Sequence, residues 1–252
     1  MTPYSGTFEE AAQELARAID LSVSESVSGI GRAAVAFSGG LDSSTIVACA
    51  RKKVGAVACA AFAKGSVDSA RAAAAAEALG VELVATELSE GLVHEELRSI
   101  SLPFEPTLMD RSLWSLYSIV SRSASKAGAK RILLGQLADE LFGGYAKYQA
   151  APEGGGESEA ERMMNADVAD YEKRGRVRDV SACTRWLEPR FPFEANGVRE
   201  LGIALPVSFK IRGGVRKAVL REAAIILGVP EGLAGVPKKA AQYSSGIQKI
   251  VR

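Results

Sequence analysis

Apolar runs alternate with helix-favouring stretches over the first 150 residues of the chain. The apolar runs, rich in Val, Ala, Ile and Leu, are typical of strands that are buried on both faces of a sheet. The stretches between them carry apolar residues at helical spacing or are rich in alanine, and most end at a glycine or before a proline. Strands are predicted at residues 35–37, 54–62, 81–88 and 131–134, and helices at 8–28, 43–50, 69–79, 90–101 and 113–127.

This alternation predicts an α/β fold. Strands joined by helical crossovers form a doubly wound, mostly parallel sheet with helices on both faces. Residues 150–160 contain proline, glycine and glutamate, and we interpret them as an exposed, mobile loop. We therefore expect an α/β region at residues 1–150, followed by a mainly helical region at 151–252 that completes the same site.

The composition narrows the class of protein. The chain has 252 residues, 47% of them hydrophobic, so it can bury a substantial core. Its three cysteines form no C-x-x-C pair, which argues against a zinc site and fits reduced thiols. No run of about 18 apolar residues predicts a membrane span, and the N-terminus lacks the basic and then apolar pattern of a secretory signal. We therefore expect a cytoplasmic protein that does not contact a membrane.

Charge and histidine content narrow the chemistry. The net charge is +1, but residues 210–252 hold nine Lys or Arg against two Glu. Such an excess suits anionic substrates such as ATP or pyrophosphate. RNA binding and a basic helix face that is merely solvated remain alternatives. His94 is the single histidine and lies in a polar helical stretch. Acid–base chemistry is therefore expected from carboxylates, Lys or Tyr.

The segment directly after the first predicted strand is the most informative part of the chain. Its turn and helix start offer bare backbone N–H groups and hydroxyls, which bind phosphate together with the helix dipole. Asp42 would repel phosphate unless it holds a divalent cation, so Mg²⁺ is predicted there. No lysine follows the glycines, which excludes a G-x-x-x-x-G-K-[ST] loop, and a serine–glycine turn without a ligand remains an alternative. The residues expected to contact phosphate are Ser38, Gly39, Gly40, Asp42, Ser43 and Ser44.

A second polar group follows the fourth predicted strand. Gly135, Gln136 and Asp139 lie in the turn after residues 131–134. Because ligands of parallel sheets bind at the carboxyl ends of the strands, Asp139 is expected to face the same cleft as Asp42. The two carboxylates could then hold Mg²⁺ on a triphosphate. In the alternative interpretation, Asp139 only caps the helix that follows.

The order Ser-Gly-Gly-x-Asp-Ser resembles the pyrophosphate-binding loop of the ATP pyrophosphatases, which include asparagine, argininosuccinate, GMP and NAD synthetases. Residues 133–145, Leu-Leu-Gly-Gln-Leu-Ala-Asp-Glu-Leu-Phe-Gly-Gly-Tyr, resemble the synthetase domain of asparagine synthetase. So do Leu-Glu-Pro-Arg-Phe-Pro-Phe at 187–193, Lys-Ala-Val-Leu-Arg at 217–221 and the lysine-containing segment 238–246. The motifs occur in order from about residue 33 to about residue 249, so the resemblance covers nearly the whole chain.

This resemblance implies the fold that is called adenine nucleotide alpha hydrolase-like and a specific chemistry. ATP would adenylate a carboxylate with release of pyrophosphate, and a nitrogen nucleophile would displace AMP. It also implies that Gly135 and Lys217 join the first loop in binding ATP, and that Asp42 and Asp139 bind Mg²⁺. Glu188, Lys239 and Gln136 would be catalytic, with Lys238 as an alternative to Lys239.

Three features depart from the family pattern. Gln136 stands where the family has glutamate, and a neutral amide cannot take a proton from a nucleophile. Leu137 stands where the family prefers glycine, which changes how closely the backbone approaches a ligand. Only about 30 residues precede the first loop, so the expected form lacks a glutaminase domain and uses free ammonia or a nitrogen source supplied by a partner.

The expected small-molecule partner is a carboxylate, with aspartate as the default. A separate glutaminase subunit and a homodimer are further candidate partners, whereas the nearly neutral charge does not favour nucleic acid. Two alternative functions remain: a tRNA-modifying enzyme that adenylates a base, and a non-catalytic ATP-binding subunit of a glutaminase complex.

Overall fold

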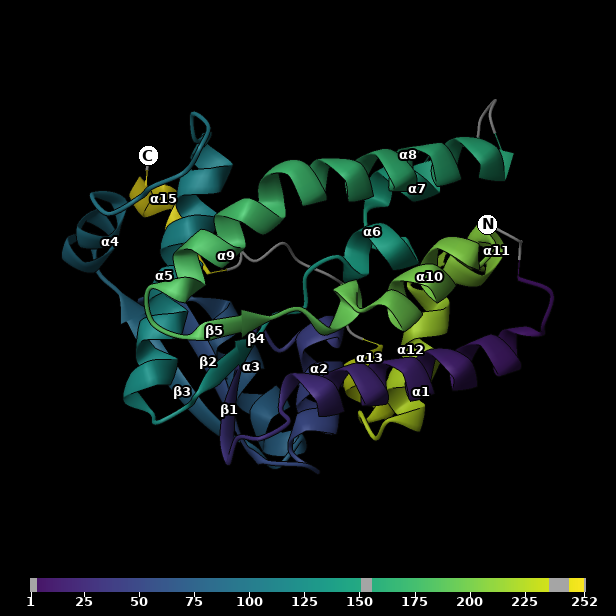
Figure 1. The fold of residues 1–252 in the computed structure, drawn as a ribbon, viewed down its shortest axis with the longest axis horizontal. Helices are drawn as coiled ribbons and strands as arrows, with labels where there is room; N and C mark the ends of the chain where they lie inside the picture. The colour runs from purple at the N-terminus through teal and green to yellow at the C-terminus, as the bar shows by residue number, and fades with distance from the viewer. Residues whose placement is uncertain (1–3, 151–155, 236–244, 252) are drawn as a thin grey trace.

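The computed structural model describes residues 4–150, 156–235 and 245–251, and its centre is a five-stranded parallel sheet (Figure 1). The order of the strands is β3-β2-β1-β4-β5, and every neighbouring pair is parallel. The predicted α/β sheet is thus confirmed. Its strands are β1 Arg32–Ala36, β2 Gly55–Ala63, β3 Glu82–Leu88, β4 Arg131–Leu133 and β5 Glu188–Arg190.

The fifth strand, β5, was not predicted. It pairs with β4 at the edge of the sheet and reads Glu-Pro-Arg, so it has no apolar run to mark it. Proline is tolerated on an edge strand because one side of that strand needs no ladder hydrogen bonds. Its position beside β4 is therefore set by pairing and not by its own side chains.

Apolar side chains of the central strand β1 enter cores on both faces of the sheet. Ala33 and Val35 are fully buried in one cluster, and Ala34 is fully buried in the other. This alternation follows from the two-residue period of a strand. It explains why a strand covered on both faces appears in the sequence as a continuous apolar run.

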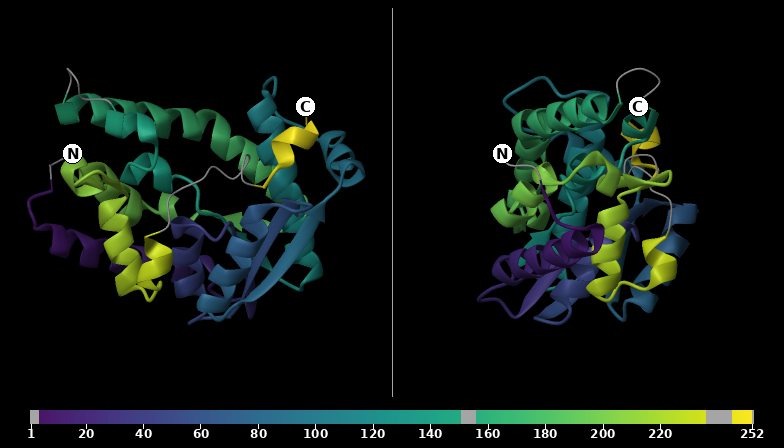
Figure 2. Two further views of the ribbon diagram at one scale, coloured as in Figure 1. Left: turned by 180° about the vertical axis from the view of Figure 1, so that it is seen from behind. Right: turned by 90° about the vertical axis from the view of Figure 1, so that its right-hand side faces the viewer.

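Helices cover both faces, as predicted (Figure 2). The first core contains side chains from helices α1, α2, α3 and α12, and the second contains side chains from α4, α5, α9 and α15. The first group comprises α1 Phe8–Ser26, α2 Leu41–Ala50, α3 Val67–Ala78 and α12 Ala218–Ile226. The second comprises α4 Glu90–Leu97, α5 Leu108–Lys126, α9 Arg176–Thr184 and α15 Ile247–Val251.

Helix α5 begins five residues before its predicted start. Thr107 caps the helix, because its hydroxyl accepts a hydrogen bond from the Asp110 N–H while Asp110 Oδ2 accepts one from the Thr107 N–H. Such a capping box fixes a helix start through polar side chains. An apolar pattern therefore does not reveal it, and this extra turn brings Asp110 into the molecule.

The rest of the chain is mainly helical, as expected. The long run through α8, a π-helical turn η1 and α9 crosses above the sheet in Figure 1, and α6 lies below α8. The remaining elements are α6 Ala138–Phe142, α7 Ala146–Ala150, α8 Gly156–Asp170, η1 Tyr171–Gly175, η2 Pro192–Glu194, α10 Asn196–Ala204, α11 Val207–Lys210, β6 Ile211–Arg212, β7 Val215–Arg216 and α13 Glu231–Ala234.

One expectation about this region is wrong in part. Residues 150–160 were predicted to form a loop, but Ala150 ends α7 and residues 156–160 begin α8; residues 151–155 lie outside the described part of the chain. Glu157, Glu159 and Ala160 favour a helix, and the two acidic residues suit the positive end of its dipole. The prediction of a loop relied on the glycines and the proline and did not take account of the helix-favouring residues that follow them.

Three simpler features agree with the sequence. All three cysteines are buried and form no disulfide. His94 is exposed. Among the helices described, none combines the length and the hydrophobicity needed to cross a bilayer.

Candidate functional site

The site lies where the order of the strands reverses. From β1 the chain proceeds to β2 and β3 on one side, and then returns to β4 and β5 on the other. In parallel sheets, ligands bind in the crevice at the carboxyl ends of the two strands that flank such a switch point. Here these strands are β1 and β4, and a cavity of about 350 Å³ opens at their carboxyl ends. That volume is within the usual range of about 300–1,000 Å³ for small-molecule sites.

The loop after β1 forms one wall of the cavity and is held by its own hydroxyl groups. Ser43 Oγ donates to the Gly40 carbonyl at 3.2 Å, and the Ser38 N–H donates to Ser43 Oγ at 3.3 Å. Helix α2 begins after Gly40, and no side chain caps its start. The first N–H groups of α2 are thus available to an anion.

Some of the residues predicted to contact phosphate line the cavity, and others lie behind it. Ser38, Gly40 and Ser43 line the cavity together with Asp42. Gly39 holds the turn, because its φ is +69° and a Cβ there would lie 3.0 Å from Ala72 Cα. Ser44 is fully buried and has no hydrogen-bond partner for its hydroxyl among the described residues.

Three charged groups meet on the floor of the cavity. Lys217 Nζ lies 2.6 and 2.7 Å from the two carboxylate oxygens of Asp42, and 2.7 Å from Asp139 Oδ1. The sequence predicted that the two carboxylates would meet, and it assigned Lys217 to ATP without placing it. Burial acts to lower the pKa of Lys217, but the carboxylates of Asp139 and Asp42 outweigh it and raise that pKa. The lysine is therefore a cation that holds two anions together.

The backbone around this charged group is strained. Leu137 and Lys217 are the two non-glycine residues with positive φ in the described part of the chain, at 72° and 57°. Leu137 directly precedes α6, which carries Asp139, and Lys217 directly precedes α12. Residues held in this conformation cost free energy and cluster at functional sites. The strain at residue 137 also explains why a glycine would be suited to that position.

Two glycines allow the close packing of this site. A Cβ on Gly135 would lie 3.1 Å from Asp42 Cβ. A Cβ on Gly144 would overlap Asp139 Oδ1 and Lys217 Cε. Side chains at these positions would push the charged groups apart.

The charged group fits a magnesium site that a substrate completes. Asp42 and Asp139 already surround a common cation, and Mg²⁺ is usually held by one or two carboxylates together with phosphate oxygens and water. Within the described ranges, no three His, Cys, Asp or Glu side chains cluster closely enough to hold a metal alone. A metal bound to Asp42 and Asp139 would therefore need further ligands, which a phosphate could supply.

The wall of the cavity above β1 and β2 is apolar. Phe37 lines it directly after β1, Ala60 and Phe62 line it from β2, and Leu113 and Leu116 line it from α5. These residues could not be assigned to a cavity from the sequence, because they belong to apolar patterns that equally predict an ordinary core. A flat aromatic group would be desolvated between them.

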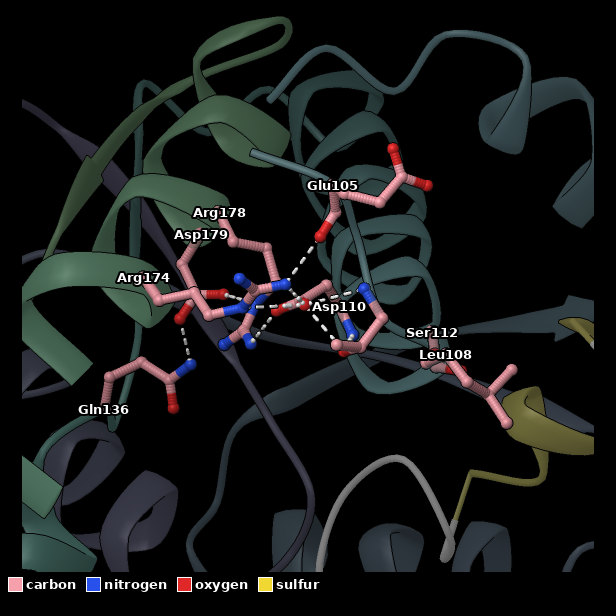
Figure 3. Close-up of polar contacts among 9 residues, drawn as sticks. Glu105, Leu108, Asp110, Ser112, Gln136, Arg174, Arg178 and Asp179 are labelled. Atoms are coloured by element: carbon pink, nitrogen blue, oxygen red, sulfur yellow. Dashed lines mark hydrogen bonds and ion pairs between the residues drawn. The ribbon is translucent and has the colours of Figure 1, made fainter. Parts of the chain in front are cut away.

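Beside the apolar wall, a buried network of charges lines the cavity (Figure 3). Asp110 accepts hydrogen bonds from Arg174 at 2.6 Å and from Arg178 at 3.3 Å. Arg178 Nε also donates to Asp179 Oδ1 at 2.8 Å, and the Gln136 amide donates to Asp179 Oδ2. Both aspartates are fully buried. We call Asp110, Arg174, Arg178, Asp179 and Gln136 the wall network.

The two aspartates of the wall network differ in acidity. Burial raises the pKa of Asp179, although Arg178 and Gln136 oppose the rise. Burial also acts to raise the pKa of Asp110, but the hydrogen bonds from Arg174 and Thr107 outweigh it, so that pKa is lowered. Within this network only Gln136 has a role predicted from the sequence. The segment with Arg178 and Asp179 belongs to the family resemblance without a predicted role, and the network joins three separate elements that no local pattern connects.

The π-helical turn η1 helps to form this part of the cavity wall. Tyr171, Arg174 and Gly175 of the turn line the cavity. The guanidinium of Arg174 lies over the ring of Phe104, 4.2 Å from its centre. A π-helical turn inserted between two α-helices is frequently found at functional sites. It lets one helical run from Gly156 to Thr184 direct several side chains toward the same cavity.

Glu188 does not lie in the cavity, so its expected place near the reacting centre is wrong. It is the register partner of Arg131, the first residue of β4, and therefore lies at the amino edge of the sheet, opposite the site. Its carboxylate contacts Arg131 Nε and Arg190 Nη2, each at 2.6 Å, and about half of the side chain is exposed. Glu188 therefore has a structural position. The expected active-site lysine, Lys239 or Lys238, falls outside the described residues.

The sheet order and the turn after β1 define a parallel α/β fold with a candidate anion site at its switch point. The model of the asparagine synthase family matches residues 14–156 and 151–250. Because this match spans nearly the whole length, the chain belongs to the asparagine synthase family.

Individual relatives show how much of a longer protein this chain represents. A Methanocaldococcus jannaschii protein designated asparagine synthetase [glutamine-hydrolyzing] 1 is 30% identical, and the alignment covers 97% of this chain but 51% of the relative. Asparagine synthetase [glutamine-hydrolyzing] 1 of Saccharomyces cerevisiae is 27% identical over 51% of this chain and 24% of its own length. The chain thus spans about half the length of the archaeal relative. NMN synthetase from Francisella tularensis is a similar solved structure, with a TM-score of 0.48, 12% identity, and coverage of 94% of this chain and 77% of that chain.

Proposed function

We propose that this protein is an ATP-dependent ligase that adenylates a carboxylate, releases pyrophosphate, and forms an amide with release of AMP. The observation that carries this proposal is the meeting of Asp42, Asp139 and Lys217 below the loop after β1, in a chain of the asparagine synthase family. Aspartate is the first acceptor to test. The nitrogen would come from free ammonia or from a separate glutaminase subunit.

In this proposal the loop after β1 binds the phosphates of ATP. The N–H groups at the start of α2 and the hydroxyls of Ser38 and Ser43 would donate to phosphate oxygens. Asp42 and Asp139 would hold Mg²⁺, which would neutralise charge on those oxygens when it is bound. The apolar wall would receive the adenine ring. An oxygen of the acceptor carboxylate then attacks the α-phosphorus, and the bond from that phosphorus to the pyrophosphate oxygen breaks.

Lys217 would have two roles in turn. In the structure it neutralises Asp42 and Asp139, which keeps two half-buried carboxylates close together. With Mg-ATP bound, Asp42 and Asp139 would hold the metal, and the Lys217 ammonium would be free to pair with phosphate oxygens. Phosphoryl-transfer chemistry depends mainly on such positioning and charge neutralisation, which agrees with a site that contains no histidine among its described lining residues.

The test is a product assay. The purified protein is incubated with Mg-ATP, ammonium and a panel of carboxylates led by aspartate, and AMP, pyrophosphate and ADP are measured separately. We expect equal amounts of AMP and pyrophosphate that depend on a carboxylate. AMP formation that depends on tRNA and not on a carboxylate would support the tRNA-modifying alternative. ATP binding without turnover, with or without a glutaminase, would support the non-catalytic subunit.

Arg71 is expected to bind the pyrophosphate end of ATP. It lines the cavity beside the loop after β1, and its Nε is buried without a hydrogen-bond partner among the described residues. Its nearest carboxylate is Asp68, at 3.3 Å. Since a hydrogen bond to a charged group contributes about 1.5–3 kcal/mol, Arg71→Gln should raise KM for ATP roughly tenfold or more. Calorimetry should show weaker pyrophosphate binding and unchanged AMP binding, whereas equal losses for both ligands would refute the assignment.

Glu188→Gln is expected to leave the rate of AMP formation unchanged. The side chain lies at the edge of the sheet opposite the cavity and contacts only Arg131 and Arg190 among the ion pairs found in the described residues. Exposed ion pairs of this kind contribute about 0–1 kcal/mol, so the melting temperature should fall by a few degrees at most. A large loss of kcat would contradict this structural position and would support the catalytic role that the resemblance implied for Glu188.

A further inference from the structure

The orientation of the Gln136 side chain is determined by Asp179. Both carboxylate oxygens of Asp179 accept hydrogen bonds, Oδ1 from Arg178 and Oδ2 from Gln136. The NH₂ group of Gln136 is the donor in this contact, which suits a carboxylate that also accepts from Arg178. Its amide oxygen is directed away from Asp179 (Figure 3). Since Gln136 lines the cavity, it offers a hydrogen-bond acceptor there.

The charges of the wall network require a neutral residue at position 136. The network contains two carboxylates, Asp110 and Asp179, and two guanidinium groups, Arg174 and Arg178, in mutual contact. A glutamate at 136 would place a third carboxylate against fully buried Asp179 and would add no cation. Like charges at hydrogen-bond distance in a buried site repel strongly, so one of them would have to take up a proton.

We propose that Gln136 is a fixed hydrogen-bond acceptor that orients the nitrogen nucleophile, and that this nucleophile enters as the free amine. Asp179 is then a positioning residue, since it acts by holding the amide of Gln136. This proposal rests on the proposed function. The lone pair of the amine forms the bond to the acyl carbon, the bond from that carbon to the AMP oxygen breaks, and AMP leaves with the electron pair. One proton passes from the nitrogen to water.

Other groups near Gln136 do not replace a base at this position. Tyr117 of α5 faces the Gln136 side chain, but burial raises its pKa, so it is protonated at neutral pH. Asp179 is occupied on both oxygens, and Glu140 accepts a hydrogen bond from the Tyr145 hydroxyl at 2.6 Å. The titratable and charged groups on the elements around Gln136 include Asp42 on α2, Asp110 and Tyr117 on α5, Asp139 and Glu140 on α6, Tyr171 and Arg174 on η1, Arg178 and Asp179 on α9, and Lys217 before α12. The same cavity is also lined by Arg71, Tyr145, Lys147, Asp167, Asp170 and Arg221.

The first experiment compares nucleophiles of different basicity. The kcat/KM for ammonia, ethylamine and hydroxylamine is measured against pH with saturating Mg-ATP and acceptor. A protein base would produce one midpoint that is common to all three amines. We expect instead that the midpoint moves with the pKa of each amine, because only the free form binds. A common midpoint would overturn the proposal while leaving carboxylate-dependent AMP formation intact, whereas absence of AMP with every acceptor would refute the proposed function as well.

Gln136→Met distinguishes the contribution of the amide oxygen from the contribution of side-chain size. Methionine has a similar length but no amide, so KM for the amine should rise at least tenfold while KM for ATP and the release of pyrophosphate change little. Asp179→Asn should raise KM for the amine in the same direction, because the amide of Gln136 is then free to rotate. Equal effects of either variant on the amine and on ATP would indicate a structural role only.

A double-mutant cycle tests the network without any turnover. Gln136→Glu should lower the melting temperature, and combination with Asp179→Asn should restore part of the loss, because it removes one of the two opposed carboxylates. The matched control is Gln149→Glu, since Gln149 donates to the Gly214 carbonyl on an exposed part of the surface. Additive effects of the two network substitutions would refute the charge argument.

Discussion

Lys217→Met is expected to lower kcat/KM for ATP by roughly a hundredfold to a thousandfold. The substitution removes the ammonium group that lies within 2.7 Å of both Asp42 and Asp139. Removing one group that stabilises the charge of a transition state typically lowers the rate by about a hundredfold to a thousandfold. The two carboxylates would then repel each other and would lose the arrangement that we propose for Mg-ATP.

Magnesium should partly replace the missing charge in this variant. The melting temperature of Lys217→Met should be lower than that of the wild type, and Mg²⁺ alone should raise it more than it raises the wild type, because a cation binding only the folded state stabilises it. Lys53→Met is a matched control, since Lys53 pairs with Asp20 at 2.9 Å away from the cavity. If the two variants have the same kcat/KM for ATP, Lys217 has no role in binding or catalysis.

Gly144→Ala is expected to reduce ATP turnover by about a hundredfold with a much smaller effect on stability. The added Cβ would overlap Asp139 Oδ1 and Lys217 Cε, so these side chains must move. They are the ends of long or flexible side chains at a cavity, so the fold can accommodate the shift. The alignment of the charged groups is lost in this shift. A displacement of about 1 Å in an active site can lower the rate by a factor of about 100.

The control for this substitution is Gly197→Ala. Gly197 lies in α10, and a Cβ there would meet no atom within 4 Å. Alanine in place of glycine stabilises a helix by up to about 1 kcal/mol, so this variant should be fully active and as stable as the wild type or more so. A fully active Gly144→Ala, with Asp139 and Lys217 unmoved in a crystal structure, would contradict the steric argument.

The site was predicted from the sequence only where its residues follow strands that the sequence also revealed. The loop after β1 and the turn after β4 each come directly after an apolar run, and parallel strands bring such segments to one edge of the sheet. The pairing of Asp42 with Asp139 could therefore be inferred from the two motifs. Lys217 could not be placed in this way, because it lies 175 residues from Asp42 and precedes a short helix whose packing depends on the whole fold.

Glu188 shows the opposite error. Its motif identified the segment correctly, but the register of β5 against β4 decides which end of the sheet the side chain reaches. The wall network also could not be predicted from the sequence. Asp110 lies in a first helical turn that a capping box fixes, and Arg174 lies in a π-helical turn. Neither the capping box nor the π-helical turn produces an apolar pattern that can be recognised in the sequence.

The sequence by itself thus determined the α/β fold, four of the five strands, the candidate phosphate-binding loop after β1 and the two carboxylates at the switch point. These features depend on periodicity and on glycine turns, which are encoded locally. Only the tertiary structure decided which cation joins the carboxylates, which charged groups surround Gln136, and where Glu188 lies. Those features depend on strand register and on contacts between distant elements, and the free energy of a buried charge is set by neighbours that no local pattern specifies.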